Sequence, residues 1–300
     1  MLNESFQNVL SNKTMEIIRL VSNLESEIKR IKEAGKTIGF VPTMGALHDG
    51  HLALVKRAVE ENDFCVVSVF VNPTQFNNSS DLEKYPRNLE HDAELLQKAG
   101  CSIIFAPEAD EMYNNDELNS QFEFDFGGLD KVMEGKFRPG HFNGVVQIVS
   151  KLFNFVQPNN AYFGEKDFQQ LSIIHHMVNE MNLKVNIIDC PIIREESGLA
   201  MSSRNERLTD IQRKNAAEIS KVLFESRNFA AQKSPNELTK WVTDRVNALK
   251  GLEVEYFEIV NSSTLQPLQS WNEPSVGCIA VFCGDVRLID NIRYNLQFNV

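Results

Sequence analysis

The sequence has few cysteines and no long apolar run. Its five cysteines are an odd number, they are widely spread and they include no Cys-x-x-Cys pair. Four of them lie in apolar, strand-like segments, so we expect buried free thiols. No stretch of about 20 apolar residues occurs, which excludes a membrane-spanning helix. The opening residues also lack the apolar core of a secretory signal, so we expect a cytoplasmic protein.

Basic clusters are scarce as well. The 300 residues include 30 Lys and Arg against 41 Asp and Glu, a formal net charge of −11. The longest basic clusters are pairs such as Lys56-Arg57 and Arg213-Lys214. Nothing therefore offsets repulsion from a phosphate backbone, and we expect no nucleic-acid partner. With 42% hydrophobic and 24% charged residues, the chain has the composition of an ordinary globular protein.

Two common nucleotide-binding motifs are missing. No Gly-x-x-x-x-Gly-Lys-Ser/Thr loop occurs, which argues against a P-loop kinase or ligase. No Gly-x-Gly-x-x-Gly follows a strand, so a dinucleotide dehydrogenase lacks its fingerprint. The chain has no internal repeats and no low-complexity segments either. The fold must therefore be inferred from the order of its apolar and amphipathic segments.

Apolar runs of strand length alternate with amphipathic segments in the first two thirds of the chain. This alternation predicts βαβ units and an α/β fold with a Rossmann-like parallel sheet. The first helix is expected to begin near Met15 and to stop at Gly35, and "QFEFDF" to form a half-exposed strand. The other expected strands are "TIGFVPT", "FCVVSVFV", "CSIIFAP", "AYFG" and "VNIIDCPII", with helices from about His51 to Glu61, Asn88 to Ala99, Asn143 to Val156 and Asp167 to Asn182.

The character of the chain changes at Arg194. A polar, loop-like segment is followed by two expected helices, from about Asp210 to Gln232 and Pro235 to Lys250, and by two β-rich runs. Helices followed by strands form an α+β unit rather than an alternating one. We therefore predict two domains, residues 1–192 and a smaller C-terminal α+β domain, residues 193–300, which would act as a lid.

The loop "PTMGALHDGH" carries the first candidate residues. It follows an expected strand, at the end where open α/β sheets bind ligands. Asp49 is suited to cap the next helix, whose N-terminus attracts phosphate. His48 and His51 would then offer N–H donors to that phosphate. Alone, the pair could equally be a solvated cap or half of a metal site.

Four other loops carry polar or basic groups. Lys166 opens a helix in "YFGEKDFQQL", where one of two glutamines should face the site; a plain surface lysine is the alternative. "LAMSSRNERLT" places serine hydroxyls next to an arginine guanidinium, a combination suited to binding pyrophosphate. The alternative is a serine-rich loop that only leads into a helix. Because strand-end loops of a parallel sheet converge on one crevice, we expect a site for a triphosphate and a small polar acid. The remaining candidates are Asn72 and Gln75 after "VSVFV", and Lys136, Arg138 and His141 in "EGKFRPGHFNGV".

Two conspicuous features are not expected to carry chemistry. His175 and His176 are adjacent on an apolar helix, so their side chains point about 100° apart and should not act as a pair. Phe122, Phe124 and Phe126 are spaced for one face of a strand and should serve packing.

The motifs in combination resemble a known family. "PTMGALHDGH", "VSVFVNPTQF", "YPR", "RPGHFNGVV", "YFGEKDFQQL" and "SSRNERL", in this order, closely resemble pantothenate synthetases (pantoate–β-alanine ligases), from about Thr14 to "DVRLIDNI". The His-x-Gly-His and Ser-Ser-Arg elements are similar to signatures of class I nucleotidyltransferases. The resemblance implies ATP-dependent condensation of (R)-pantoate with β-alanine through a pantoyl adenylate, with magnesium accompanying ATP. It also implies a homodimer.

The resemblance assigns roles to individual residues. It implies that His51, expected as general acid, acts with His48, Lys166, Ser202, Ser203 and Arg204. Gln75, Gln170 and Asn72 would bind pantoate or β-alanine. No metal ligand is assigned, and Asp92 is only a weak candidate. The implied ATP-binding residues are Met44, Gly45, Ala46, Leu47, His48, Asp49, Gly50, His51, Gly164, Glu165, Lys166, Asp167, Ile193, Met201, Ser202, Ser203 and Arg204.

The sequence departs from the family in two places. "NNSSDLEKYPR" follows "TQF" where the family has an acidic stretch with Gly-Pro over the pantoate pocket, and the first dozen residues extend beyond the family's usual start. Two alternative functions stay open. One is a nucleotidyltransferase with a stable adenylylated product, for example on phosphopantetheine. The other is an ATP-sensing module without catalysis.

Overall fold

The computed structural model describes residues 15–76, 82–83, 85–114 and 122–294, so our expectations for the N-terminal extension and for most of the loop after "TQF" lie outside it. The strands are β1 (Glu16–Ile18), β2 (Ile38–Thr43), β3 (Phe64–Val69), β4 (Ile103–Phe105), β5 (Asn160–Gly164), β6 (Asn186–Cys190), β7 (Leu252–Asn261), β8 (Ser275–Cys283) and β9 (Val286–Tyr294). The helices are α2 (Val21–Glu33), α3 (Asp49–Glu61), α5 (Leu89–Lys98), α6 (Ala109–Met112), α8 (Met133–Phe137), α9 (His141–Val156), α10 (Phe168–Glu180), α11 (Asp210–Ser226) and α12 (Pro235–Asn247). The 3-10 turns are η1 (Pro73–Gln75), η2 (Glu165–Asp167), η3 (Ser203–Arg207) and η4 (Arg227–Phe229).

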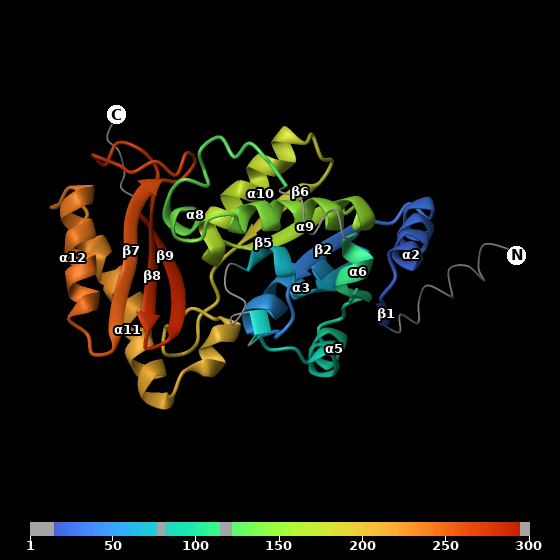
Figure 1. Ribbon diagram of the computed structural model, residues 1–300, viewed down its shortest axis with the longest axis horizontal. Helices are drawn as coiled ribbons and strands as arrows, with labels where there is room; N and C mark the ends of the chain where they lie inside the picture. The colour runs from blue at the N-terminus through green and yellow to red at the C-terminus, as the bar shows by residue number, and fades with distance from the viewer. Residues whose placement is uncertain (1–14, 77–81, 84, 115–121, 295–300) are drawn as a thin grey trace, which may run out of the picture.

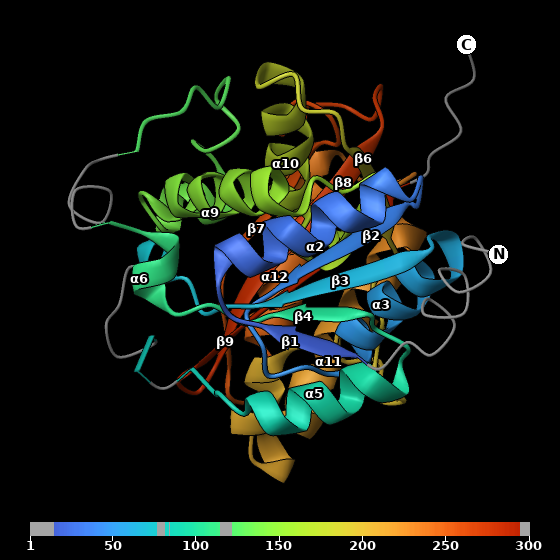
Figure 2. The ribbon, with the colours of Figure 1, turned by 90° about the vertical axis from the view of Figure 1, so that its right-hand side faces the viewer.

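The first sheet is six-stranded and parallel, in the order β1-β4-β3-β2-β5-β6, as the alternating pattern predicted. Helices cover both faces (Figure 2). α2, α9 and α10 bury their apolar residues against one face, and α3 and α5 against the other. The central strands are therefore apolar on both sides, which explains why β3 has the continuous run "FCVVSV".

The order of the strands places the site. The chain proceeds from β2 outward to β3 and β4, and then returns to add β5 on the other side of β2, followed by β6. The direction of winding therefore reverses between β2 and β5. In open α/β sheets the carboxyl ends of the strands at such a reversal form the ligand-binding crevice.

Two elements of the first part differ from the sequence prediction. The first helix begins at Val21, because Glu16–Ile18 pair with β4 as an edge strand. Ile18 is buried in the same core as Leu24. The apolar residues of this three-residue strand therefore matched the three- and four-residue spacing of the helix that follows, and the sequence pattern showed no boundary between them. Residues 122–126 form no strand, so the prediction of a strand for "QFEFDF" was wrong. Phe124 and Phe126 pack edge to face at 5.1 Å, and the segment lies against the main core, so these side chains serve packing as expected.

The C-terminal part contains α11, α12 and the antiparallel sheet β7-β8-β9 (Figure 1). The second β-rich run is a hairpin, β8 and β9, which turns at Gly284 with φ +63°. One face of this sheet packs on α11 and α12. The other face contributes Tyr256, Val260 and Cys278 to the main core, so the two parts are in contact. The boundary near Ile192 remains a prediction.

All five cysteines are buried and free, as expected. In the part of the chain that the structure describes, no helix is long and apolar enough to cross a membrane.

Candidate active site

The loop from β2 to α3 is held in shape by a buried carboxylate. Gly45 and Ala46 have φ of +78° and +51°, a left-handed conformation that is costly for a residue with a side chain. Asp92, on α5, accepts hydrogen bonds from the backbone N–H groups of Ala46 at 3.0 Å and Leu47 at 2.8 Å. Its side chain is only 1% exposed. Asp92 therefore stabilises the loop through both of its carboxylate oxygens.

His48 and His51 lie together at the start of α3. Their ring centroids are 4.0 Å apart. The N–H of Gly50 donates to Nδ1 of His48 at 3.1 Å, and the N–H of His48 donates to Nδ1 of His51 at 3.4 Å. A neutral imidazole whose Nδ1 accepts carries its proton on Nε2. Both rings are thereby fixed as Nε2–H donors.

The two imidazoles are held uncharged. Burial and the nearby Lys166 lower the pKa of His48 to about 4. Burial, together with His48 and Lys166, lowers the pKa of His51 well below its usual range. At neutral pH both side chains are therefore neutral hydrogen-bond donors rather than acids.

Lys166 lies in the η2 turn between β5 and α10. Its side chain is 18% exposed, and its ammonium is 3.7 Å from Asp167. The chain thus places a cation beside two neutral donors at the carboxyl ends of β2 and β5. This arrangement is suited to an anion.

The third loop approaches from the C-terminal part. Ser202 caps η3 by accepting the N–H of Arg204 at 3.3 Å, and the hydroxyls of Ser203 and Tyr85 are 3.4 Å apart. Upstream, Arg194 and Asp290 form two hydrogen bonds of 2.6 and 2.9 Å. These contacts hold residues 194–204, which form no regular helix or strand before η3, in a fixed position beside the crevice.

These loops enclose one cavity of about 180 Å³. Its walls include most of the ATP-binding residues expected from the sequence, together with Gln170 and Tyr85. Of that expected set, the cavity is lined by Met44, His48, Gly50, His51, Gly164, Lys166, Asp167, Ile193, Met201, Ser202, Ser203 and Arg204.

The other expected ATP-binding residues do not line the cavity. Gly45 borders a separate hollow beside Asp92, Ala46 is held by its N–H bond to Asp92, and Leu47 is buried in the core under α3. Asp49 is exposed at the first turn of α3 and does not cap it as expected, because the N-cap residue is His48. Glu165 turns away to pair with Arg293 at 2.9 Å.

The amide side chains differ in their engagement. Asn72 is 1% exposed and donates to Gly144 O and to Gln75 Oε1, while its own oxygen accepts from the hydroxyl of Tyr113 at 2.8 Å. Asn72 is thus a support for Gln75, whose Nε2 points at the sulfur of Met44 at 2.8 Å. Gln170 lines the cavity, as expected for one of the two glutamines, while Gln169 donates to two buried carbonyl groups.

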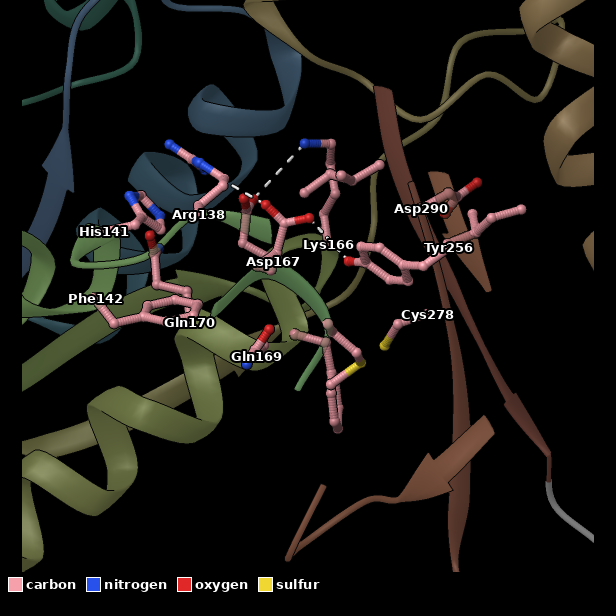
Figure 3. Close-up of a pocket in the computed structure, with 15 residues that line it drawn as sticks. Arg138, His141, Phe142, Lys166, Asp167, Gln169, Gln170, Tyr256, Cys278 and Asp290 are labelled. Atoms are coloured by element: carbon pink, nitrogen blue, oxygen red, sulfur yellow. Dashed lines mark hydrogen bonds and ion pairs between the residues drawn. The ribbon is translucent and has the colours of Figure 1, made fainter. Parts of the chain in front are cut away.

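A second, smaller cavity of about 30 Å³ adjoins the first at Lys166 and Gln170 (Figure 3). It lies between the loop before α9 and the C-terminal strands. Arg138 and His141 line it, and the ring of His141 is within 2.8 Å of the carbonyl oxygen of Gln75. Burial, with Arg138 nearby, lowers the pKa of His141 to about 4. Two basic residues of this loop, Arg138 and His141, are therefore directed at the backbone carbonyl group of Gln75. Lys136, the third residue expected there, lies over the ring of Phe137 instead.

A buried ion-pair network borders this cavity and was missed by sequence reasoning. Glu134 accepts from the hydroxyl of Tyr256 at 2.8 Å and from Arg287 at 2.7 and 3.0 Å. Burial alone would raise the pKa of Glu134, but the hydrogen bonds from Arg287 lower it to about 2. No local pattern could have found this pair, since Arg287 is 153 residues further along the chain.

His175 and His176 do not act as a pair, as expected. His175 Nε2 is 2.8 Å from Asp189, whereas His176 Nε2 is 2.9 Å from the carbonyl oxygen of Asp125. Within the described residues, no three His, Cys, Asp or Glu side chains are grouped to hold a metal ion.

The fold and the site define a class: an α/β protein with a cavity suited to an anion where the winding of a parallel sheet reverses. Comparison with known proteins gives the family. The family model for pantoate-beta-alanine ligase matches residues 16–293. The chain belongs to the pantoate-beta-alanine ligase family and is an enzyme of that family.

Individual relatives agree. The pantothenate synthetase of Bacteroides fragilis (strain YCH46) is 56% identical over 282 residues, covering 93% of this chain and 99% of the relative. The crystal structure of pantothenate synthetase from Thermus thermophilus matches with a TM-score of 0.87 at 42% identity, over 93% of this chain and 99% of that one. The Francisella tularensis pantoate-beta-alanine ligase, complexed with beta-gamma ATP and beta-alanine, matches with a TM-score of 0.79 at 35% identity, over 95% and 99%.

Proposed function

We propose that this enzyme condenses (R)-pantoate with β-alanine in two steps at the cavity between β2 and β5. In the first, a carboxylate oxygen of pantoate attacks the α-phosphorus of ATP, and pyrophosphate leaves. In the second, the amine of β-alanine attacks the acyl carbon of the adenylate, the amine loses a proton, and AMP leaves with the electron pair of the broken C–O bond. The observation that carries this proposal is the meeting of His48, His51, Lys166 and the Ser202–Arg204 loop in one cavity.

The first step requires that charge growing on the transferred phosphate be stabilised. Lys166 supplies a cation, and Ser202, Ser203 and Arg204 supply hydroxyl and guanidinium donors. Donors fixed before the reaction stabilise such charge without having to reorganise. The shared cavity lining supports these roles.

His51 acts in this proposal as a hydrogen-bond donor, not as the general acid that the family resemblance implied. Its Nδ1 accepts a backbone N–H, and its pKa is lowered by burial and by His48. The ring is therefore neutral and carries its proton on Nε2, and a neutral imidazole is a very weak acid. Pyrophosphate is a good leaving group, so a hydrogen bond suffices.

The acid substrate would lie against the neutral amides Gln75 and Gln170. Amide groups donate to and accept from the hydroxyls of pantoate without pairing with its carboxylate. A cation there would stabilise the ground state of the nucleophile and slow the attack. Asn72 would serve indirectly, because it holds Gln75.

Magnesium is proposed to enter with ATP, where it would neutralise phosphate charge. Among the described residues no three His, Cys, Asp or Glu side chains are grouped to hold an ion, which agrees with binding mainly through substrate phosphates. We also propose that the enzyme is a homodimer, that it is cytoplasmic and that its C-terminal part closes over bound ATP.

The test is a pyrophosphate-release assay with ATP and pantoate, with and without β-alanine. We expect a single turnover with pantoate alone and sustained turnover once β-alanine is added. If pantoate causes no release, the proposed first step is wrong. Sustained release without β-alanine would instead indicate a nucleotidyltransferase with a stable adenylylated product.

A further inference from the structure

The turn that carries Lys166 is held by a residue from the other end of the chain. Asn291, on β9, donates through its side-chain amide to the carbonyl oxygens of Glu165 at 2.7 Å and Lys166 at 3.0 Å. Two consecutive carbonyl groups are thus fixed by one NH₂ group. Asn291 is 5% exposed, so these hydrogen bonds are shielded from water.

The turn has little support of its own. η2 is only three residues long and has no side-chain cap at its start. It also brings the Lys166 cation to the beginning of α10, where the helix dipole disfavours positive charge. Contacts from β9 compensate, because Arg293 pairs with Glu165 at 2.9 Å and lies 5.1 Å over the ring of Phe168.

We propose that Asn291 is a positioning residue for Lys166, a role that rests on the function proposed above. Asn291 lines neither cavity and therefore acts through the turn rather than on a ligand. The position of a lysine ammonium depends on where its backbone is held, and a misplacement of about 1 Å at a reacting centre costs on the order of 100-fold in rate. The same strand fixes the third loop, since Asp290 binds Arg194. β9 thus holds both phosphate-binding segments in one frame.

The variant that tests this is Asn291→Leu, which has a similar size and no donor. We expect kcat for pyrophosphate release to fall by about 10- to 100-fold, with little change in KM for pantoate. Tyr294→Phe is the matched control, because it removes a buried hydrogen bond to Ser226 from the same strand without touching the turn. The control should keep kcat within about twofold while losing a similar amount of stability.

A double-mutant comparison separates positioning from general destabilisation. In a Lys166→Ala background, Asn291→Leu should lower the rate by no more than about twofold, since the group it positions is gone. If the two losses multiply, or if Asn291→Leu alone leaves kcat intact, the proposal is overturned. Asn291→Ala gives the same comparison if the leucine variant does not fold.

One measurement does not depend on activity. Amide hydrogen exchange over residues 165–170 should become faster in Asn291→Leu and stay unchanged in Tyr294→Phe. Unchanged exchange in the leucine variant would overturn the positioning role even if the enzyme is active. Failure of the wild-type enzyme to release pyrophosphate, with exchange behaving as expected, would overturn the proposed function and leave the contact to the turn intact.

Discussion

At the scale of single residues, the site depends on side chains that fix the backbone as much as on those that face the ligand. Asp92 binds two N–H groups of the loop before α3, and Asn291 binds two carbonyl groups of the turn before α10. Each lies far in the sequence from the loop it holds. The loops that carry His48 and Lys166 are therefore held in place by residues that are distant in the sequence.

His51→Ala should lower the rate of pyrophosphate release by about 100-fold, the loss expected for one transition-state donor. If the neutral ring only donates a hydrogen bond, the wild-type rate should not rise as the pH falls from 8 to 6. A rapid-quench measurement over that range decides the point. A rate that increases as imidazole protonates would restore the general-acid role.

Asp92→Asn should reduce activity by roughly 10-fold or more, because an NH₂ group would replace an oxygen that accepts from Ala46 or Leu47 and leave a buried donor unpaired. Asp63→Asn is the control. That carboxylate also accepts a backbone N–H, from Thr37 at 2.9 Å, at the opposite end of β2. Equal loss of activity in both variants would show that Asp92 contributes stability alone.

At the scale of elements, the helix α8 and the strands β7 and β9 are joined by the network around Glu134. Its carboxylate binds Tyr256 and Arg287, and it is 3.4 Å from Arg138, which reaches toward the carbonyl group of Gln75. The C-terminal sheet is therefore connected to the proposed pantoate site through charged groups. A change at this junction should affect stability first.

Glu134→Gln should destabilise the protein by about 2 kcal/mol, because Arg287 loses its hydrogen bonds to one of its two carboxylate partners and keeps only those to Glu255. The midpoint of urea unfolding measures the loss. Asp285→Asn, which breaks the exposed pair with Arg207, should cost less than about 1 kcal/mol. Similar losses in the two variants would contradict a buried, desolvated network.

At the scale of the whole molecule, the histidines make stability depend on pH. His48 and His141 have pKa values of about 4, below the ordinary 6.5, and that of His51 is also lowered. Between pH 6.5 and 4 the unfolded chain therefore binds more protons than the folded one. Acid in this window favours the unfolded chain.

We therefore expect the free energy of unfolding to be constant above about pH 7 and to fall below pH 6.5, by at most about 1.4 kcal/mol per pH unit for each histidine. Urea unfolding at pH 7.5, 6 and 5 measures the slope. His141→Gln should reduce it. A free energy that stays level down to pH 5 would mean that these rings become protonated in the folded protein.

Much of this protein is determined by its sequence. The alternation of apolar runs and amphipathic helices specified a parallel sheet, because strands buried on both faces need apolar side chains throughout. Motifs in the loops predicted that His48, His51, Lys166 and the Ser202–Arg204 segment would meet, since the carboxyl ends of parallel strands converge, and these residues line one cavity. The first strand was missed because three residues are too few to break a helical periodicity.

Only the tertiary structure decided which residues support the site. Asp92 was a weak metal candidate from its place after "YPR", and its two backbone partners are 45 and 46 residues away. Local patterns gave Asn291 and Arg287 no role, because Lys166 and Glu134, which they contact, are more than 100 residues distant. Local patterns specify elements and reactive groups, whereas contacts between distant segments form only when the elements pack. Those contacts set the protonation of the histidines and the position of the lysine.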